Sequence, residues 1–211
     1  MAPRRGPRGS VHRRVTRDAQ LRQILVFAEG AVTERDYLHG WRKETEGRVA
    51  IELNPRPGLA PMTMVQEAIK AKVASDRLER KQGGPSYDAI WCLFDVDNVE
   101  NIPQVRQLAR SNGILLAISN PCIELWFVLH CHDQTAYIEG PAARSESKRL
   151  LRCGKHLPPR VRAELIEKYP DARRRAIALE EWHRGNDTPM PANPSSSVWR
   201  FVDDVRASEV S

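Results

Sequence analysis

The sequence of 211 residues has no apolar stretch long enough to cross a bilayer, which argues against an integral membrane protein. Its Arg-rich start lacks the apolar segment of a secretory signal. From these two absences we expect a cytoplasmic protein that does not associate with membranes. The four cysteines show no paired spacing, so a disulfide framework is not expected. The sequence also has no Gly-rich phosphate loop of the Walker type and no internal repeat.

Positive charge is present in excess, and it is unevenly spread. Residues 1–22 hold seven arginines against one aspartate, which accounts for the whole net charge of +6. Segment 144–175 holds eleven basic residues against four acidic ones. Basic surfaces that flank an acidic centre favour a polyanionic partner such as nucleic acid. The alternative is a solubilising tail followed by a solvated helix face.

Apolar runs and turn residues alternate along the chain in a pattern typical of a parallel α/β sheet. We expect strands at residues 23–30, 49–53, 88–94 and 114–119. Helices are expected at 33–44, 64–80, 102–112 and 122–130, and the pattern stays helical from about Pro141 onward. Thr33 with Asp36 is typical of a helix N-cap, and the serines of "NPSSSVW" are expected to cap a last helix. The run "DAIWCLF" does not alternate, so that strand is predicted to be buried on both faces.

These elements predict a doubly wound parallel sheet of about four strands with a helical C-terminal extension. We divide the chain into a disordered basic arm (1–22), an α/β core (23–135) and a helical region packed on that core (136–211).

Acidic residues end two of the predicted strands. Glu29 follows the first, and Asp95 and Asp97 follow the third. Ligands of an open parallel sheet bind beyond the carboxyl ends of its strands. Clustered carboxylates repel one another unless a cation lies between them, and Mg²⁺ prefers such oxygen ligands. Each residue alone fits a turn or a solvated strand end; the three together predict a metal site.

Two further carboxylates are candidates for the same site. Glu34 lies in the first turn of a predicted helix, where the helix dipole alone would also explain an acidic residue. Glu124 is the only charged residue in the apolar run "CIELWFVLH" before its final histidine, and a buried carboxylate needs a partner or a metal. If one side of that helix faces water, Glu124 is simply solvated.

Four segments carry a resemblance to a known family: "ILVFAEGAVTERDYL", "LFDVDN", "ISNPCIELWFVLH" and "NPSSSVWRFVD". Behind an Arg-rich start they resemble the RloB-like family from about Arg13 to the C-terminus. The resemblance implies a Toprim-type domain in which Glu29, Asp95 and Asp97 hold Mg²⁺ or Mn²⁺. It also implies a setting in phage defence or restriction, beside an ABC-type or AAA ATPase. Similar sequences often have a glutamate where this chain has Ala31, which predicts weaker catalysis if that carboxylate matters.

Together these observations predict a Mg²⁺-dependent Toprim-type nuclease that cleaves DNA or RNA as an effector of abortive infection. Glu29 would also act as general acid or base, and Thr33, Asn98 and Asn120 would line the site. The residues expected to bind phosphates are basic: Arg13, Arg14, Arg17, Arg149, Arg152 and Lys155. One alternative is a catalytically silent subunit that docks on nucleic acid or on an ATPase. Nucleotidyl transfer is a third, which the missing Walker loop disfavours. The sequence is compatible with a homo-oligomer but does not specify one.

Overall fold

The computed structural model of the protein describes residues 21–82, 86–96 and 101–207. Within them, five strands form one sheet in the spatial order β2-β1-β3-β4-β5. The first four strands in this order are parallel, and β5 runs antiparallel to β4. Their bounds are β1 Arg22–Ala28, β2 Val49–Leu53, β3 Ala89–Asp95, β4 Leu115–Asn120 and β5 Ser195–Ser196.

Helices connect and cover these strands. The described residues contain eight of them: α1 Thr33–Glu44, α2 Pro61–Gln82, α3 Ile102–Ser111, α4 Ile123–Cys131, α5 Gly140–Leu151, α6 Pro159–Glu167, α7 Tyr169–Gly185 and α8 Val198–Arg206. None of them combines the length and the apolar character that a membrane-spanning helix needs.

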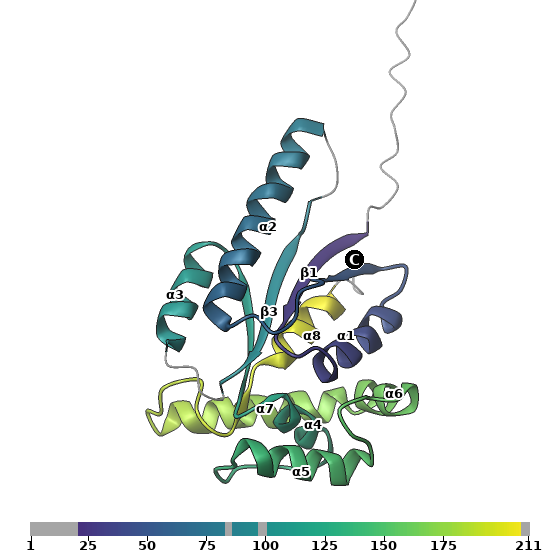
Figure 1. The fold of residues 1–211 in the computed structure, drawn as a ribbon. Helices are drawn as coiled ribbons and strands as arrows, with labels where there is room; N and C mark the ends of the chain where they lie inside the picture. The colour runs from purple at the N-terminus through teal and green to yellow at the C-terminus, as the bar shows by residue number, and fades with distance from the viewer. Residues whose placement is uncertain (1–20, 83–85, 97–100, 208–211) are drawn as a thin grey trace, which may run out of the picture.

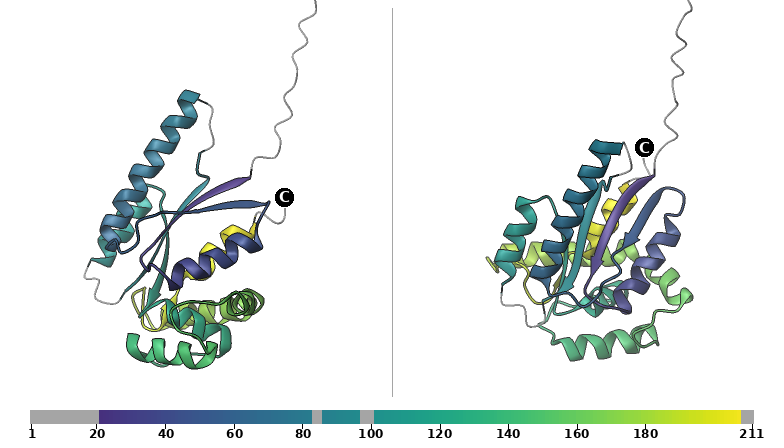
Figure 2. Two further views of the ribbon diagram at one scale, coloured as in Figure 1. Left: turned by 45° about the vertical axis from the view of Figure 1, so that its right-hand side comes forward. Right: turned by 45° about the horizontal axis from the view of Figure 1, so that its top comes forward.

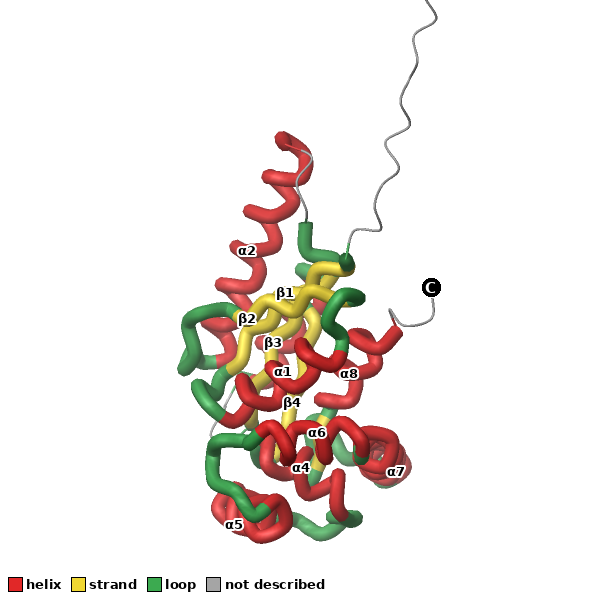
Figure 3. Tube along the Cα trace, turned by 90° about the vertical axis from the view of Figure 1, so that its right-hand side faces the viewer, coloured by secondary structure: helices red, strands yellow, loops and turns green. Residues whose placement is uncertain are grey.

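The helices lie in layers around the sheet. Helices α2 and α3 cover one face and α1 and α8 cover the other (Figures 1 and 2). Helices α4 to α7 gather below the carboxyl ends of the strands, and Figure 3 shows α5 at the far end of this layer. This placement puts a helical floor directly beyond the strand ends.

The core divides into two clusters because side chains alternate across a strand. Trp91 and Leu93 of β3 pack with α1, α4 and α8, whereas Ile90 and Cys92 pack with α2 and α3. Residues 89–94 are all buried, which confirms the expectation for the non-alternating run. The doubly wound α/β sheet predicted from the sequence is therefore present, and its arrangement is consistent with a Toprim-like fold.

Several local expectations were wrong. The sheet has a fifth strand, formed by Ser195–Ser196, where a helix cap was expected. Ser197 does not cap α8: its Oγ accepts a hydrogen bond from the Ile118 backbone at 2.8 Å. Nor does Thr33 cap α1, since the N-cap residue is Val32 and it makes no side-chain cap. These polar side chains bond to segments far along the chain, and local periodicity contains no information about such partners.

Candidate functional site: a carboxylate cluster at the strand ends

The first carboxylate of the cluster is placed by the register between two adjacent strands. β1 pairs with β3 so that Ala28 lies opposite Leu93, and the Glu29 N–H donates to the Leu93 carbonyl at 3.0 Å. The Asp95 N–H in turn donates to Glu29 Oε2 at 3.1 Å. The Glu29 carboxylate therefore lies against the last residue of β3. β1 and β3 are adjacent in the sheet, which is the condition for Glu29 and Asp95 to meet.

Glu34 reaches the same edge from the first turn of α1. Its Oε1 accepts a hydrogen bond from the Gly30 N–H at 2.9 Å, and its side chain is buried. A Cβ atom on Gly30 would lie 1.7 Å from Glu34 Oε2. Only glycine at position 30 therefore allows this carboxylate to close onto the turn between β1 and α1.

The N-terminus of α4 faces the end of β3. The backbone N–H of Ile123, in the first turn of α4, donates a hydrogen bond to the Asp95 carboxylate. A helix N-terminus with free N–H groups favours a negative charge at this place. Glu124 follows Ile123, is half-buried, and interacts electrostatically with both Asp95 and Glu34.

Burial and mutual repulsion shift the protonation of this cluster. Burial raises the pKa of Asp95 to about 9, and the charges of Glu34, Glu124 and Glu29 add to the rise, whereas the Ile123 N–H opposes it. The pKa of Glu34 is also raised, first by burial and then by Glu124 and Glu29, against the hydrogen bonds of its own and the Gly30 backbone. Carboxylates in this state are favourable hosts for a cation, which would displace the proton and relieve the repulsion.

The described side chains supply only part of a metal ligand set. Among the residues that the structure describes, no three His, Cys, Asp or Glu side chains converge closely enough to hold an ion by themselves. Asp97 and Asn98, both expected at this site, lie outside the described residues. A partial protein ligand set suits Mg²⁺, which keeps several waters and takes only one or two protein carboxylates. The chemistry of Glu29 and Asp95 thus fits a hard divalent cation.

Basic residues predicted to bind phosphates lie partly beside this cluster. The Thr33 hydroxyl donates to the Lys155 carbonyl at 3.0 Å, and the Leu157 N–H donates to Asp36 Oδ2 at 2.9 Å. The connection between α5 and α6 is therefore attached to the first turn of α1, next to Glu34.

Arg152, at the end of α5, belongs to the same connection and is exposed. Arg149 is exposed too, but Glu146 binds its guanidinium through two hydrogen bonds of 2.9 and 2.6 Å. Arg13, Arg14 and Arg17 lie outside the described residues.

Sequence reasoning missed two groups that shape the site. The Gly30 backbone could have been suspected from the Glu-Gly step that ends a strand. The Ile123 N–H could have been suspected from the short distance along the chain between the end of β4 and the start of an apolar helix. Asn120, which was expected at the site, ends β4, and its Nδ2 donates to the Pro191 carbonyl at 2.9 Å.

The chain matches a known protein family. The family model described as RloB-like protein matches residues 24–205, which is most of the chain. No curated protein and no solved structure matches the chain at a significant level.

Proposed function

The chain belongs to the RloB-like protein family, and on this premise we propose that it is a metal-dependent, Toprim-type nuclease that hydrolyses phosphodiesters of DNA or RNA. The observation that carries the proposal is that carboxylates from four separate elements interact electrostatically near the end of β3. Glu29, Glu34, Asp95 and Glu124 come from the ends of β1 and β3 and the first turns of α1 and α4. Repulsion between these carboxylates destabilises the folded protein. A site that binds a cation is the most direct explanation for their proximity.

Each residue has a role in this proposal. Glu29 and Asp95, with Asp97, would hold Mg²⁺ or Mn²⁺, which when bound neutralises charge on the phosphodiester and activates water. Glu34 has a raised pKa, and its Oε1 is held by Gly30, so it can give or take a proton at Oε2. Lys155 and Arg152 would hold the flanking phosphates, since their segment is attached to the first turn of α1.

We further propose that this activity serves phage defence together with an ABC-type ATPase partner. This part rests on the family resemblance alone. A second candidate is a silent binding subunit, and it is favoured by the exposed basic side chains of Arg152 and Lys155. In that case these basic side chains would bind nucleic acid or the ATPase, and no phosphodiester would be hydrolysed.

The test is induced expression of the wild type, of Asp95→Asn and of Asp171→Asn, with and without the ATPase gene, followed by sizing of total DNA and RNA. Asp171 is an exposed aspartate paired with Arg174 at 3.2 Å, so it is a matched control away from the cluster. We expect one nucleic acid to be fragmented by the wild type and by Asp171→Asn but not by Asp95→Asn. Intact nucleic acid in every strain, also during infection, would favour the silent subunit.

A further inference from the structure

A cavity of about 550 Å³ opens at the carboxyl ends of β3 and β4. Val96 and Asn120 line it from the ends of β3 and β4, and Tyr137 and Arg144 line it from the connection before α5 and from α5 itself. Val96 directly follows Asp95, so the cavity and the carboxylates share one strand end. The volume is within the range of pockets that bind small organic groups.

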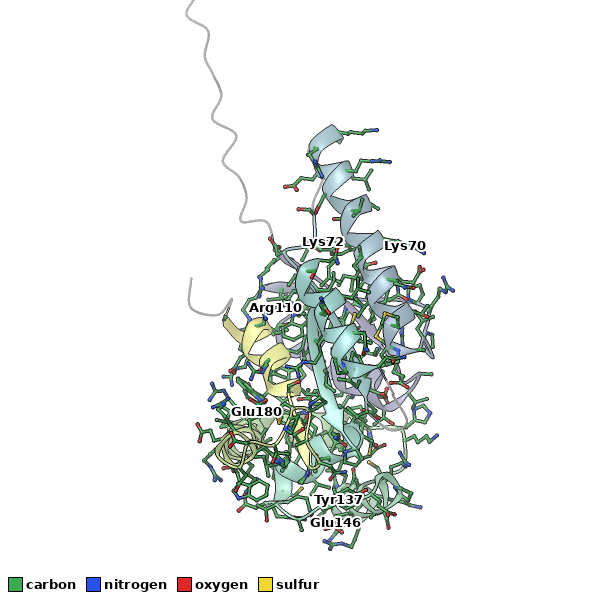
Figure 4. All side chains as sticks on the ribbon, turned by 90° about the vertical axis from the view of Figure 1, so that its left-hand side faces the viewer. Lys70, Lys72, Arg110, Tyr137, Glu146 and Glu180 are labelled. Atoms are coloured by element: carbon green, nitrogen blue, oxygen red, sulfur yellow. The ribbon has the colours of Figure 1, made fainter. Side chains whose placement is uncertain are left out.

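Tyr137 presents an exposed aromatic ring at this cavity. Its exposed fraction is 71%, although the neighbouring Ile138 packs against the core. The backbone around it is anchored, because Asn193 accepts from the Ile138 N–H at 3.1 Å and donates to the Ile138 carbonyl at 2.8 Å. In Figure 4, Tyr137 lies toward the same end of the molecule as Glu146 of α5, away from Lys70 and Lys72 of α2. An aromatic ring on an anchored backbone can stack on a ligand at a low cost in conformational entropy.

The polar groups around the ring suit an uncharged, hydrogen-bonding ligand. Asn120 uses its Nδ2 to bond the Pro191 carbonyl, and within the described part of the chain no donor reaches its Oδ1. That oxygen can accept from an exocyclic amine. Arg144 and Glu139 both line the cavity, so its lining carries side chains of opposite charge.

We propose that this cavity binds one unpaired nucleobase of the substrate, stacked on Tyr137 and hydrogen-bonded to Asn120. The adjoining phosphodiester would then be placed at the carboxylate cluster. A base inside a duplex is stacked on both faces and cannot enter, so the site selects single-stranded or looped nucleic acid. This inference rests on the proposed function, because it assigns the substrate class of the same site.

The experiment measures binding of the full chain to three fluorescent probes in EDTA, where no metal-dependent cleavage occurs. The probes are a single-stranded RNA, its blunt duplex, and an abasic sugar-phosphate strand of equal length. Tyr137→Ala is expected to bind the single strand about 5- to 150-fold more weakly, the range found for loss of base–aromatic stacking. Its affinity for the duplex and for the abasic strand should stay unchanged.

Two variants provide the controls. Tyr137→Phe keeps the ring and should bind the single strand nearly as well as the wild type does. Trp182→Ala removes another exposed aromatic, 57% exposed on α7 and not part of the cavity, and should have no effect. Because Tyr137 is exposed, its truncation is expected to leave the circular dichroism spectrum and the melting temperature unchanged.

The outcomes separate this proposal from the nuclease proposal. Equal loss on the abasic strand, no loss on the single strand, or a wild type that binds none of the probes would overturn the base site. If Tyr137-dependent binding occurs but the wild type never cleaves with Mg²⁺, the base site is retained and the nuclease is not. If Asp95-dependent cleavage occurs and Tyr137→Ala binds and cleaves like the wild type, the nuclease is retained and the base site is not.

Discussion

Replacing Asp95 by asparagine should stabilise the metal-free protein. The folded pKa of Asp95 is raised from an ordinary value of 3.8 to about 9, so between these values the folded state keeps a proton that the unfolded state has lost. Because the folded state binds more protons, the free energy of unfolding falls as pH rises, by about 1.4 kcal/mol per pH unit. At pH 7 the raised pKa of Asp95 has therefore lowered the free energy of unfolding by about 4 kcal/mol relative to its value at low pH.

Asparagine has the shape of the protonated acid and can still accept a hydrogen bond from the Ile123 N–H. The variant is therefore expected to gain up to about 4 kcal/mol at pH 7, which corresponds to a rise in melting temperature of about 8 to 16 °C in a chain of this size. The assay is thermal unfolding in EDTA from pH 5 to 9, followed by differential scanning fluorimetry with added Mg²⁺. The metal should stabilise the wild type and not the variant.

The dependence of stability on pH shows whether the pKa of Asp95 is raised in the folded protein. The stability of the wild type should fall above pH 5 more steeply than that of Asp95→Asn, and the two should converge near pH 4. Asp171→Asn should follow the wild type, because Asp171 is exposed. Parallel profiles for the wild type and Asp95→Asn, or a variant less stable than the wild type at pH 8, would show that Asp95 is not held in a protonating environment.

Three other changes test particular contacts. Tyr37→Phe removes the acceptor for the buried Trp126 Nε1, 2.9 Å away, and should cost about 1 to 3 kcal/mol in urea unfolding. Gly30→Ala should displace the Glu34 carboxylate and lower cleavage at least about tenfold while the protein stays folded, as shown by circular dichroism. Lys155→Ala should reduce by about one the slope of log affinity for nucleic acid against log salt.

Each of these changes has a matched control. Tyr137→Phe alters an exposed tyrosine and should not change the urea midpoint. Gly154→Ala adds a Cβ with nothing within 4 Å and should cleave normally. Lys70→Ala removes a lysine of α2 that is paired with Glu67, and it should leave the salt slope unchanged. If a control variant shows the same change as the test variant, the contact removed in the test variant is not the cause of that change.

Much of the fold was readable from the chain because burial follows periodicity. The apolar run before Asp95 had no polar face, so it had to be a central strand, and the structure places β3 between β1 and β4. The expected helix at 122–130 agrees with α4 to within one residue, and seven of its nine residues are buried. This helix has no polar face because α4 packs against α5 and α7 on one side and against the sheet on another.

The candidate site was readable only in part. Acidic residues at strand ends can be recognised in a parallel sheet because the carboxyl ends of all its strands lie at one edge. That reasoning placed Glu29 and Asp95 together, as their hydrogen bond shows. It could not show that Glu34 would turn back onto Gly30, because the approach depends on the path of the chain between β1 and α1.

The sequence by itself determined the order and type of most elements, since hydrophobic spacing is a local property of the chain. Tertiary structure alone decided which polar groups meet. Ser195–Ser196 became a strand because the edge of β4 was available for pairing, and Ser197 bonds Ile118, 79 positions away in the sequence. Tyr137 is exposed, and the backbone of the next residue, Ile138, is held by Asn193 from a distant loop. Such contacts arise from the packing of the whole chain, and no local pattern of residues contains them.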